Sequence, residues 1–187
     1  MRTPPPGWMD DKCMAWLRRV GATIKGVGVE LGSYHGRSTS ALVERMPEGA
    51  VLYCIDNWLG AEGDPDQQRG YDGSDAVYLA FCKNLDAEIK AGRVVPLRMD
   101  TVAGANEVLN ARGAMAADFM FIDADHRYEA VARDIISAKA LVRPGGVIAG
   151  HDYSTRRWTG VRRAVDEAFG AEVRRGPGSI WYVRRPS

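Results

Sequence analysis

Short apolar runs alternate with longer segments of mixed polarity along most of the chain. In the longer segments apolar residues recur at every third or fourth position, which is typical of helices packed on one face. The short runs are rich in Val, Ile, Leu and Phe, which is typical of buried strands. We expect strands near residues 27–31, 51–55, 94–97, 119–122 and 147–149. We expect helices near residues 10–20, 38–45, 74–90, 103–111, 128–141 and 160–169.

The alternation of strands and helices determines the expected architecture. Strands joined through helices form right-handed crossovers, so this alternation predicts a parallel sheet. Two short β-prone runs, 172–174 and 179–183, flank a glycine–proline turn at 176–178 and predict a closing hairpin. The expected fold class is therefore α/β, a doubly wound, mostly parallel seven-stranded sheet with an antiparallel C-terminal strand and helices on both faces.

Length and composition fit one domain. The chain has 187 residues, of which 45% are hydrophobic, and this is enough to bury a core without disulfides. We expect a single domain over 1–187, with an N-terminal helical extension at 1–26. The stretch 57–75 is rich in Gly and Asp and long for an ordinary connection, so we interpret it as a candidate lid beside the site.

The small net charge and the lack of a signal-peptide pattern reduce the classes of binding partner that we expect. Lys and Arg number 25 against 24 Asp and Glu, and a net charge of +1 gives no long-range attraction to nucleic acid or an anionic membrane. The N-terminus lacks the apolar core of a signal peptide, and no run approaches the roughly twenty apolar residues of a membrane span. The three cysteines form no close metal-ligand pair. We therefore expect a cytoplasmic protein that binds neither nucleic acid nor membrane.

The segment Val27–Ser38 carries the first candidate site. An apolar strand runs into Glu30, a turn with Gly32 and Gly36 follows, and a helix then begins with free amides. In the dinucleotide fingerprint G-x-G-x-x-G the glycines hold a pyrophosphate. Here an acid occupies the turn, and an acid repels phosphate and suits a cationic amine. The segment therefore indicates a nucleoside-type cofactor site.

Polar and aromatic residues also follow the next two strands, at what would be the same sheet edge. Asp56 can accept both hydrogen bonds of a ribose diol, or it can cap a turn. Asp100 can cap the helix that follows it. Trp58 can offer a face to adenine or pack against its neighbours.

This order of motifs resembles the class I S-adenosylmethionine-dependent methyltransferases, which have a Rossmann-like fold. The resemblance extends from Val27 to about Phe169. It implies that Glu30 lies near the methionine part of the cofactor, that Asp56 binds the ribose and that Asp100 lies near the adenine amine. The expected cofactor contacts are Glu30, Gly32, Tyr34, Gly36, Ser38, Asp56, Trp58, Asp100, Thr101 and Asp123.

A second candidate site combines acids and histidines. Asp123 directly follows the expected strand at 119–122, and His126 comes three residues later. His151 and Asp152 follow the expected strand at 147–149, so they should lie at the same edge of the sheet. Such a set can hold a divalent cation with open positions for substrate, and carboxylate oxygens favour Mg²⁺ or Mn²⁺. Alternatively, Asp123 caps the next helix and both histidines only line the sheet edge.

These segments resemble the metal-dependent O-methyltransferases, the group that includes catechol O-methyltransferase and methyltransferases of natural-product sugars. The resemblance implies that Asp123, His151 and Asp152 bind the metal and that His126 is the general base. His151 stands where that group usually has an acid. A second interpretation therefore makes His151 a general base that acts without an ion.

The sequence thus predicts an S-adenosylmethionine-dependent O-methyltransferase that acts on a hydroxyl of a sugar, saccharide or secondary metabolite. Few insertions surround the predicted core, so a homodimer whose second copy completes the acceptor pocket is a further expectation. Arg156, Arg157 and Trp158 can contact a polar or acidic acceptor. The rival interpretations are a non-catalytic nucleotide-binding protein of this fold and an NAD-dependent dehydrogenase.

Overall fold

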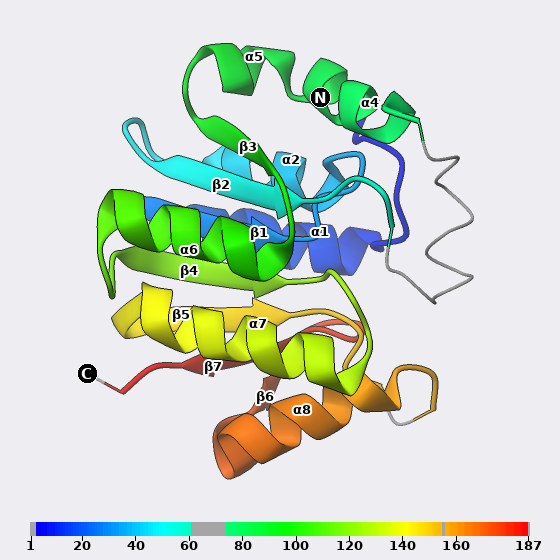
Figure 1. Cartoon of the computed structure of the whole chain (residues 1–187), viewed down its shortest axis with the longest axis vertical. Coiled ribbons are helices and arrows are strands. Elements are labelled where there is room, and N and C mark those ends of the chain that lie inside the picture. The colour runs from blue at the N-terminus through cyan, green and yellow to red at the C-terminus, as the bar shows by residue number, and fades with distance from the viewer. Residues whose placement is uncertain (1–2, 61–73, 155, 187) are drawn as a thin grey trace.

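The computed structural model of the chain describes residues 3–60, 74–154 and 156–186. These residues form one seven-stranded sheet with helices on both sides (Figure 1). The strands are β1 Val27–Leu31, β2 Val51–Asp56, β3 Val94–Arg98, β4 Ala117–Ile122, β5 Val142–Gly150, β6 Arg174–Arg175 and β7 Trp181–Arg184. The helices are α1 Asp11–Gly21, α2 Arg37–Arg45, α4 Ala76–Asn84, α5 Asp86–Lys90, α6 Thr101–Arg112, α7 Tyr128–Leu141 and α8 Thr159–Phe169, followed by the short 3₁₀ turn η1 Gly170–Glu172.

The sheet has the strand order β3-β2-β1-β4-β5-β7-β6. The first five strands in sequence pair in parallel, and β7 runs antiparallel to both β5 and β6. This confirms the expected fold class. Within the C-terminal hairpin, β7 lies between β5 and β6, and β6 forms the edge of the sheet.

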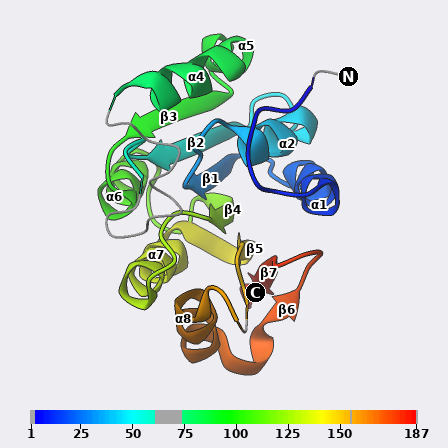
Figure 2. The same cartoon turned by 90° about the vertical axis from the view of Figure 1, so that its right-hand side faces the viewer.

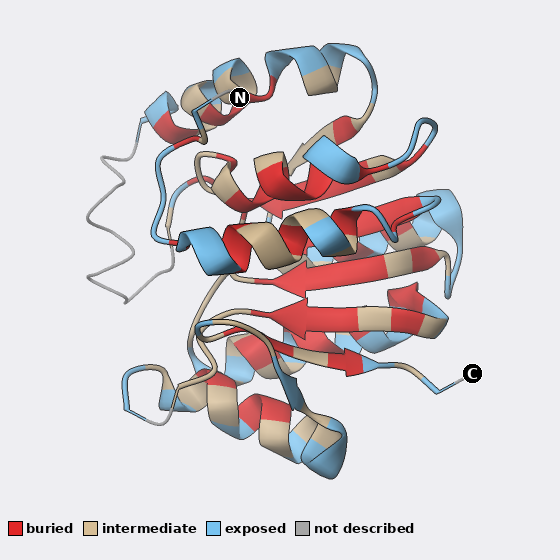
Figure 3. Ribbon diagram, turned by 180° about the vertical axis from the view of Figure 1, so that it is seen from behind, coloured by how far each residue is buried: buried red, intermediate tan, exposed pale blue. Residues whose placement is uncertain are grey.

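Each face of the sheet has its own apolar core. Side chains of α1, α2 and α4, among them Leu17, Leu42 and Phe81, pack on one face. Side chains of α6, α7 and α8, among them Val108 and Ile135, pack on the other. Figure 2 shows α6, α7 and α8 on the face opposite α1 and α2. The central strands β1, β2 and β4 are buried along most of their length (Figure 3), because both faces of the sheet are covered there.

The chain reverses direction across the sheet between β1 and β4. It steps outward from β1 to β2 and β3 and then returns to β4, which pairs with β1 on the other side. Ligands of open α/β sheets bind outside the carboxyl ends of the strands at such a switch point. The turn after β1 is also tightly fitted there: Gly32 has φ +83, and a Cβ on it would lie 2.2 Å from the carbonyl oxygen of Asp123.

Several element boundaries differ from the sequence prediction for local reasons. The helix expected at 74–90 is two helices, α4 and α5, because the backbone at Leu85 leaves the helical region (φ −110°, ψ +18°). The strand expected at 147–149 is longer: β5 begins at Val142, directly after α7, and includes the stretch 144–146 of Pro-Gly-Gly. In the hairpin the first strand is Arg174–Arg175, since Glu172 belongs to the 3₁₀ turn.

Most of the candidate lid at 57–75 lies outside the described residues, which end at 60 and resume at 74. Among the helices that the structure describes, none has the length and apolar character to span a bilayer.

Candidate active site

A cavity lies at the carboxyl ends of the parallel strands and gathers most of the predicted site residues. Its wall combines the turn after β1, the ends of β2 and β3, and the residues that follow β4 and β5. The predicted residues that line it are Gly32, Tyr34, Ser38, Asp56, Asp100, Thr101, Asp123, His126, His151 and Asp152. Glu30, Gly36 and Trp58 do not line it.

Glu30 lies beneath the glycine turn and has no exposed surface. Its Oε2 accepts hydrogen bonds from Ser33 Oγ at 2.8 Å and from Thr39 Oγ1. Its Oε1 is buried without a hydrogen-bond partner among the described residues. Burial raises the pKa of Glu30, against the hydrogen bonds from neighbouring hydroxyl groups. A buried carboxylate with an unsatisfied oxygen is suited to stabilise a positive charge placed above the turn.

Asp56 ties the end of β2 to the turn after β1. Its Oδ2 accepts hydrogen bonds from the backbone amides of Ser33 and Tyr34, each at 2.9 Å, and its Oδ1 accepts one from the amide of Trp58 at 2.7 Å. Burial raises the pKa of Asp56, and these amides oppose the rise. The carboxylate therefore holds the turn in shape and at the same time faces the cavity.

Trp58 does not have the position that stacking on adenine requires. The side chain has no exposed surface, its Nε1 donates to the Tyr34 carbonyl oxygen at 2.8 Å, and its ring packs against Tyr78 and Phe81 of α4. The prediction of a stacking face was wrong, because the packing of α4 encloses the ring. Gly36 likewise serves as the N-cap residue of α2, with φ +87, and a Cβ on it would lie 2.4 Å from Leu85 Cδ2.

Two acids accept hydrogen bonds from the first turn of α6. Asp100 caps the helix, and its Oδ1 accepts from the amides of Val102 at 2.9 Å and Ala103 at 3.4 Å. Thr101 Oγ1 donates to Asp134 Oδ1 at 2.6 Å. Burial raises the pKa of Asp134 to about 7, against the Thr101 hydrogen bond. Capping and a contact with the cavity are compatible, because Asp100 and Thr101 both line the wall.

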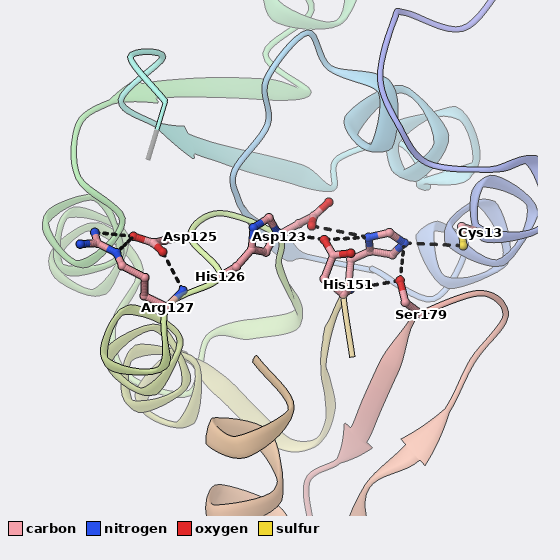
Figure 4. A network of polar contacts seen from close by, with 8 residues as sticks. Cys13, Asp123, Asp125, His126, Arg127, His151 and Ser179 are labelled. Carbon is pink, nitrogen blue, oxygen red and sulfur yellow. Dashed lines mark hydrogen bonds and ion pairs between the residues drawn. The ribbon is translucent and has the colours of Figure 1, made fainter. Parts of the chain in front are cut away.

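The acids and histidines converge in one cluster, which Figure 4 shows from close by. His126 Nε2 lies 2.9 Å from Asp152 Oδ2, and His151 Nδ1 lies 3.3 Å from the same oxygen. His151 Nδ1 is also 3.8 Å from Asp123 Oδ1. On its other side, His151 Nε2 lies 3.0 Å from Ser179 Oγ and 3.9 Å from the sulfur of Cys13.

The charges in this cluster depend on one another. Burial raises the pKa of Asp123 to about 7, against the charge of His151. Burial alone would lower the pKa of His151, but the hydrogen bond with Asp152 and the charge of Asp123 raise it to about 9. The hydrogen bonds from His126 and His151 outweigh burial and hold the pKa of Asp152 below its usual range. The carboxylates of Asp123 and Asp152 thus favour the charged form of His151.

Backbone strain marks the same edge of the sheet. Among the described residues, four non-glycine residues have positive φ: Tyr34, Trp58, Met115 and Asp152. Tyr34, Trp58 and Asp152 follow β1, β2 and β5, at the carboxyl edge. Such conformations cost on the order of 1 kcal/mol or more each and concentrate at functional sites. His126 is further fixed by stacking on Trp158, with ring centroids 4.0 Å apart and planes 22° apart.

The donor set fits a divalent cation. One donor atom from each of Asp123, His126 and Asp152 can be chosen so that all lie within 4.8 Å of one another. His151 Nδ1 faces both carboxylates as well. Two carboxylates with one imidazole are ligands that Mg²⁺ or Mn²⁺ accepts. The structure thus makes His126, which we predicted as the base, a second candidate ligand beside His151.

Sequence reasoning missed several residues of the site. Gly7, Trp8 and Met9, which precede α1, line the cavity, and so does Arg37. Cys13 and Ser179 flank His151 from elements far away in the sequence. Burial raises the pKa of the Cys13 thiol to about 12, so the sulfur stays protonated. The one available signal was Trp8, an isolated aromatic residue after a proline run.

Comparison with known proteins agrees with this architecture. A family model described as a methyltransferase domain matches residues 29–153. A crystal structure of the calicheamicin methyltransferase CalS11 superposes with a TM-score of 0.71 at 16% identity, covering 91% of this chain and 76% of that one. An apo structure of CalS11, described as a TDP-rhamnose 3'-O-methyltransferase, gives 0.65 at 16% identity with the same coverage. An O-methyltransferase from Bacillus cereus in complex with SAH gives 0.66 at 20% identity, covering 97% and 84%.

The family match spans most of the chain, including β1, β2, β3, β4 and the residues that follow β5. The chain therefore belongs to this methyltransferase family. It is an S-adenosylmethionine-dependent methyltransferase with the class I fold.

Proposed function

We propose that the protein transfers a methyl group from S-adenosylmethionine to a hydroxyl group of a sugar, saccharide or secondary metabolite. The observation that supports this most directly is the shared cavity. The glycine turn at the switch point and the cluster of Asp123, His126, His151 and Asp152 belong to one wall. A cofactor bound at the turn would therefore present its methyl group close to groups that can deprotonate a hydroxyl.

In this proposal the turn after β1 holds the cofactor. Glu30 acts from below, through its buried charge, and Asp56 faces the ribose while it fixes the turn. Gly32, Tyr34, Ser38, Asp100, Thr101 and Asp123 complete the cofactor side of the cavity. The bound cofactor supplies an electrophilic methyl group on a sulfonium. A hydroxyl oxygen attacks that carbon in line, the carbon–sulfur bond breaks, and the hydroxyl proton must be removed.

His126 is the proposed general base. It lines the cavity, and its Nε2 lies 2.9 Å from Asp152 Oδ2, which orients the ring and stabilises the imidazolium after proton transfer. A divalent cation would be held by Asp123 and Asp152 with His151 as the third ligand, and it would lower the pKa of an acceptor hydroxyl. In the alternative assignment, His126 and not His151 is the imidazole ligand of the cation.

Manganese binding separates the two assignments. We expect His151→Gln to weaken Mn²⁺ binding, measured by calorimetry, and His126→Gln to leave it unchanged. His126→Gln should nevertheless lower turnover by roughly 10²- to 10⁴-fold, the usual contribution of a general base. His35→Gln is the matched control for cation binding, because His35 does not line the cavity. Loss of Mn²⁺ binding in His126→Gln would make His126 a ligand, and activity that survives chelation would remove the cation from the proposal.

The acceptor class rests on the CalS11 likeness and on the cavity rim. CalS11 is described as acting on TDP-rhamnose. Here Arg133 and Arg157 line the cavity, and the Arg157 guanidinium lies 5.0 Å from the centre of the Trp158 ring. Such a rim fits a sugar with an acidic substituent. A panel of nucleotide sugars, free sugars and phenols with methyl-labelled cofactor tests this, and labelling of phenols alone would contradict it.

A further inference from the structure

Residues 5–9, here called the strap, cross the surface before α1. The strap begins in a proline run, which restricts its backbone and lowers the entropy lost on ordering it. It ends at Met9, which is buried in the core, and Asp10 then caps α1 by accepting from the Cys13 amide at 2.8 Å. The C-terminal end of the strap is therefore anchored. In Figure 2 this dark blue segment passes in front of α2 before it enters α1.

Arg37, the first residue of α2, clamps the strap. Its Nε donates to the Met9 carbonyl oxygen at 2.8 Å and its Nη1 donates to the Pro5 carbonyl oxygen at 3.1 Å. Gly7 lies against the aliphatic part of the same side chain, where a Cβ would come within 3.0 Å of Arg37 Cδ. Arg37 is only 20% exposed. The guanidinium is thus engaged by main-chain carbonyls, and its Nη2 also lies 3.8 Å from Asp11 Oδ1.

The clamp places Trp8 over the glycine turn. The indole stacks on the Tyr34 ring, with centroids 4.8 Å apart and planes 27° apart. Trp8 is nevertheless 72% exposed. Gly7, Trp8 and Met9 line the same cavity as Gly32, Tyr34 and Asp56. A large aromatic ring that is fixed at the mouth of a cavity and left mostly exposed is suited to contact a ligand.

We propose that the strap is a wall of the cofactor subsite, that Trp8 contacts the bound cofactor and that Arg37 is a positioning residue acting through the strap. The inference rests on the cofactor position proposed above. Cofactor is favoured over acceptor as the ligand, because Trp8 stacks on Tyr34 and the strap is hydrogen-bonded to Arg37, and both of these residues belong to the β1–α2 side of the cavity. The acid–histidine cluster lies on β4 and β5, beyond the switch point.

Calorimetry with S-adenosylhomocysteine tests the contact without knowledge of the acceptor. We expect Trp8→Ala to weaken binding roughly tenfold, and Trp8→Phe to restore most of it, since a ring face is what the contact needs. Leu79→Ala is the matched control, because Leu79 is 61% exposed and does not line the cavity. Equal affinity of Trp8→Ala and wild type would overturn the contact. No binding by wild type would instead overturn the cofactor position.

A double-mutant cycle tests the role of Arg37. If Arg37 acts through the strap, Arg37→Ala should weaken binding about as much as Trp8→Ala, and the double variant should lose little more. Arg37→Lys keeps the charge but not the two directed hydrogen bonds, so it should behave like Arg37→Ala. Arg18→Ala, which removes an arginine outside the cavity, is the control. Independent, multiplying losses would show that Arg37 contacts the cofactor directly and would overturn its positioning role.

Discussion

Glu30 shows how one residue can influence a ligand without lining the cavity. Its carboxylate is enclosed, and one of its oxygens lacks a hydrogen-bond partner among the described residues. An unsatisfied buried oxygen costs free energy in the absence of a compensating charge. A cationic cofactor bound above the turn would supply that charge. The residue type was readable from the sequence, whereas its position under the turn was not.

We expect Glu30→Gln to weaken S-adenosylmethionine binding about tenfold, because the amide keeps the shape but removes the charge. Calorimetry with S-adenosylmethionine measures this. Thr39→Val is a useful companion, since it removes a donor to the carboxylate without changing its charge. Unchanged affinity in Glu30→Gln would contradict the electrostatic role.

Asp134 should make stability depend on pH. Burial raises its folded-state pKa to about 7, above the ordinary value of 3.8, so the unfolded chain ionises first as the pH rises. The contribution of Asp134 to the free energy of unfolding is therefore most favourable below about pH 4. It falls between about pH 4 and 7 and stays reduced above pH 7. At 1.36 kcal/mol per pKa unit the loss is on the order of 4 kcal/mol.

Asp134→Asn should remove this dependence. Urea unfolding at pH 8 should show a variant more stable than wild type, and at pH 4.5 the difference should shrink, because wild-type Asp134 is then protonated in the folded state. Asn can keep a hydrogen bond to Thr101. A variant that is less stable than wild type at pH 8 would contradict the raised pKa.

At the scale of elements, the turn between β1 and α2 is held in place by contacts from several other elements. Gly32 approaches the backbone just after β4, Asp56 of β2 accepts from the amides of Ser33 and Tyr34, and the strap covers the ring of Tyr34. The turn is therefore built from three strands and the N-terminus together. A substitution in any of these elements should therefore alter the affinity for the cofactor.

Gly32→Ala tests this constraint against a control with similar backbone geometry. Gly49 has φ +81 but no atom within 4 Å of its Cβ position, whereas Gly32 has φ +83 and a backbone oxygen at 2.2 Å. We expect Gly49→Ala to cost roughly 1 kcal/mol of unfolding free energy and Gly32→Ala at least about 2 kcal/mol more. Chemical denaturation measures both losses. Equal losses of unfolding free energy in the two variants would contradict the tight packing at the turn.

At the scale of the whole molecule, a class I methyltransferase core brings distant residues to one edge. Asp56, Asp123, His126 and Asp152 line one cavity because β2, β4 and β5 are parallel and end on the same side. Ser179 and Cys13 reach the same cluster from the C-terminal hairpin and from α1. The site is thus assembled by the topology of the sheet.

Ligand-linked stability distinguishes the cofactor from a nicotinamide dinucleotide. A ligand at about 100 times its Kd stabilises the folded state by about 2.7 kcal/mol. S-adenosylhomocysteine should therefore raise Tm by several degrees in a thermal melt, and NAD⁺ at the same concentration should leave it unchanged. A shift with NAD⁺ alone would favour the dehydrogenase interpretation.

The sequence by itself determined the order of strands and helices, the parallel sheet and the acids and histidines that follow its strands. These depend on local periodicity and on turn residues such as Gly32 and Gly36, and both can be read along the chain. Only the tertiary structure decided which aromatic ring reaches the cavity. Trp58 is enclosed by α4, while Trp8 is held over the turn by Arg37, 28 residues from Met9 in sequence. Burial and long-range hydrogen bonds depend on which segments meet in space, and local sequence pattern does not encode that.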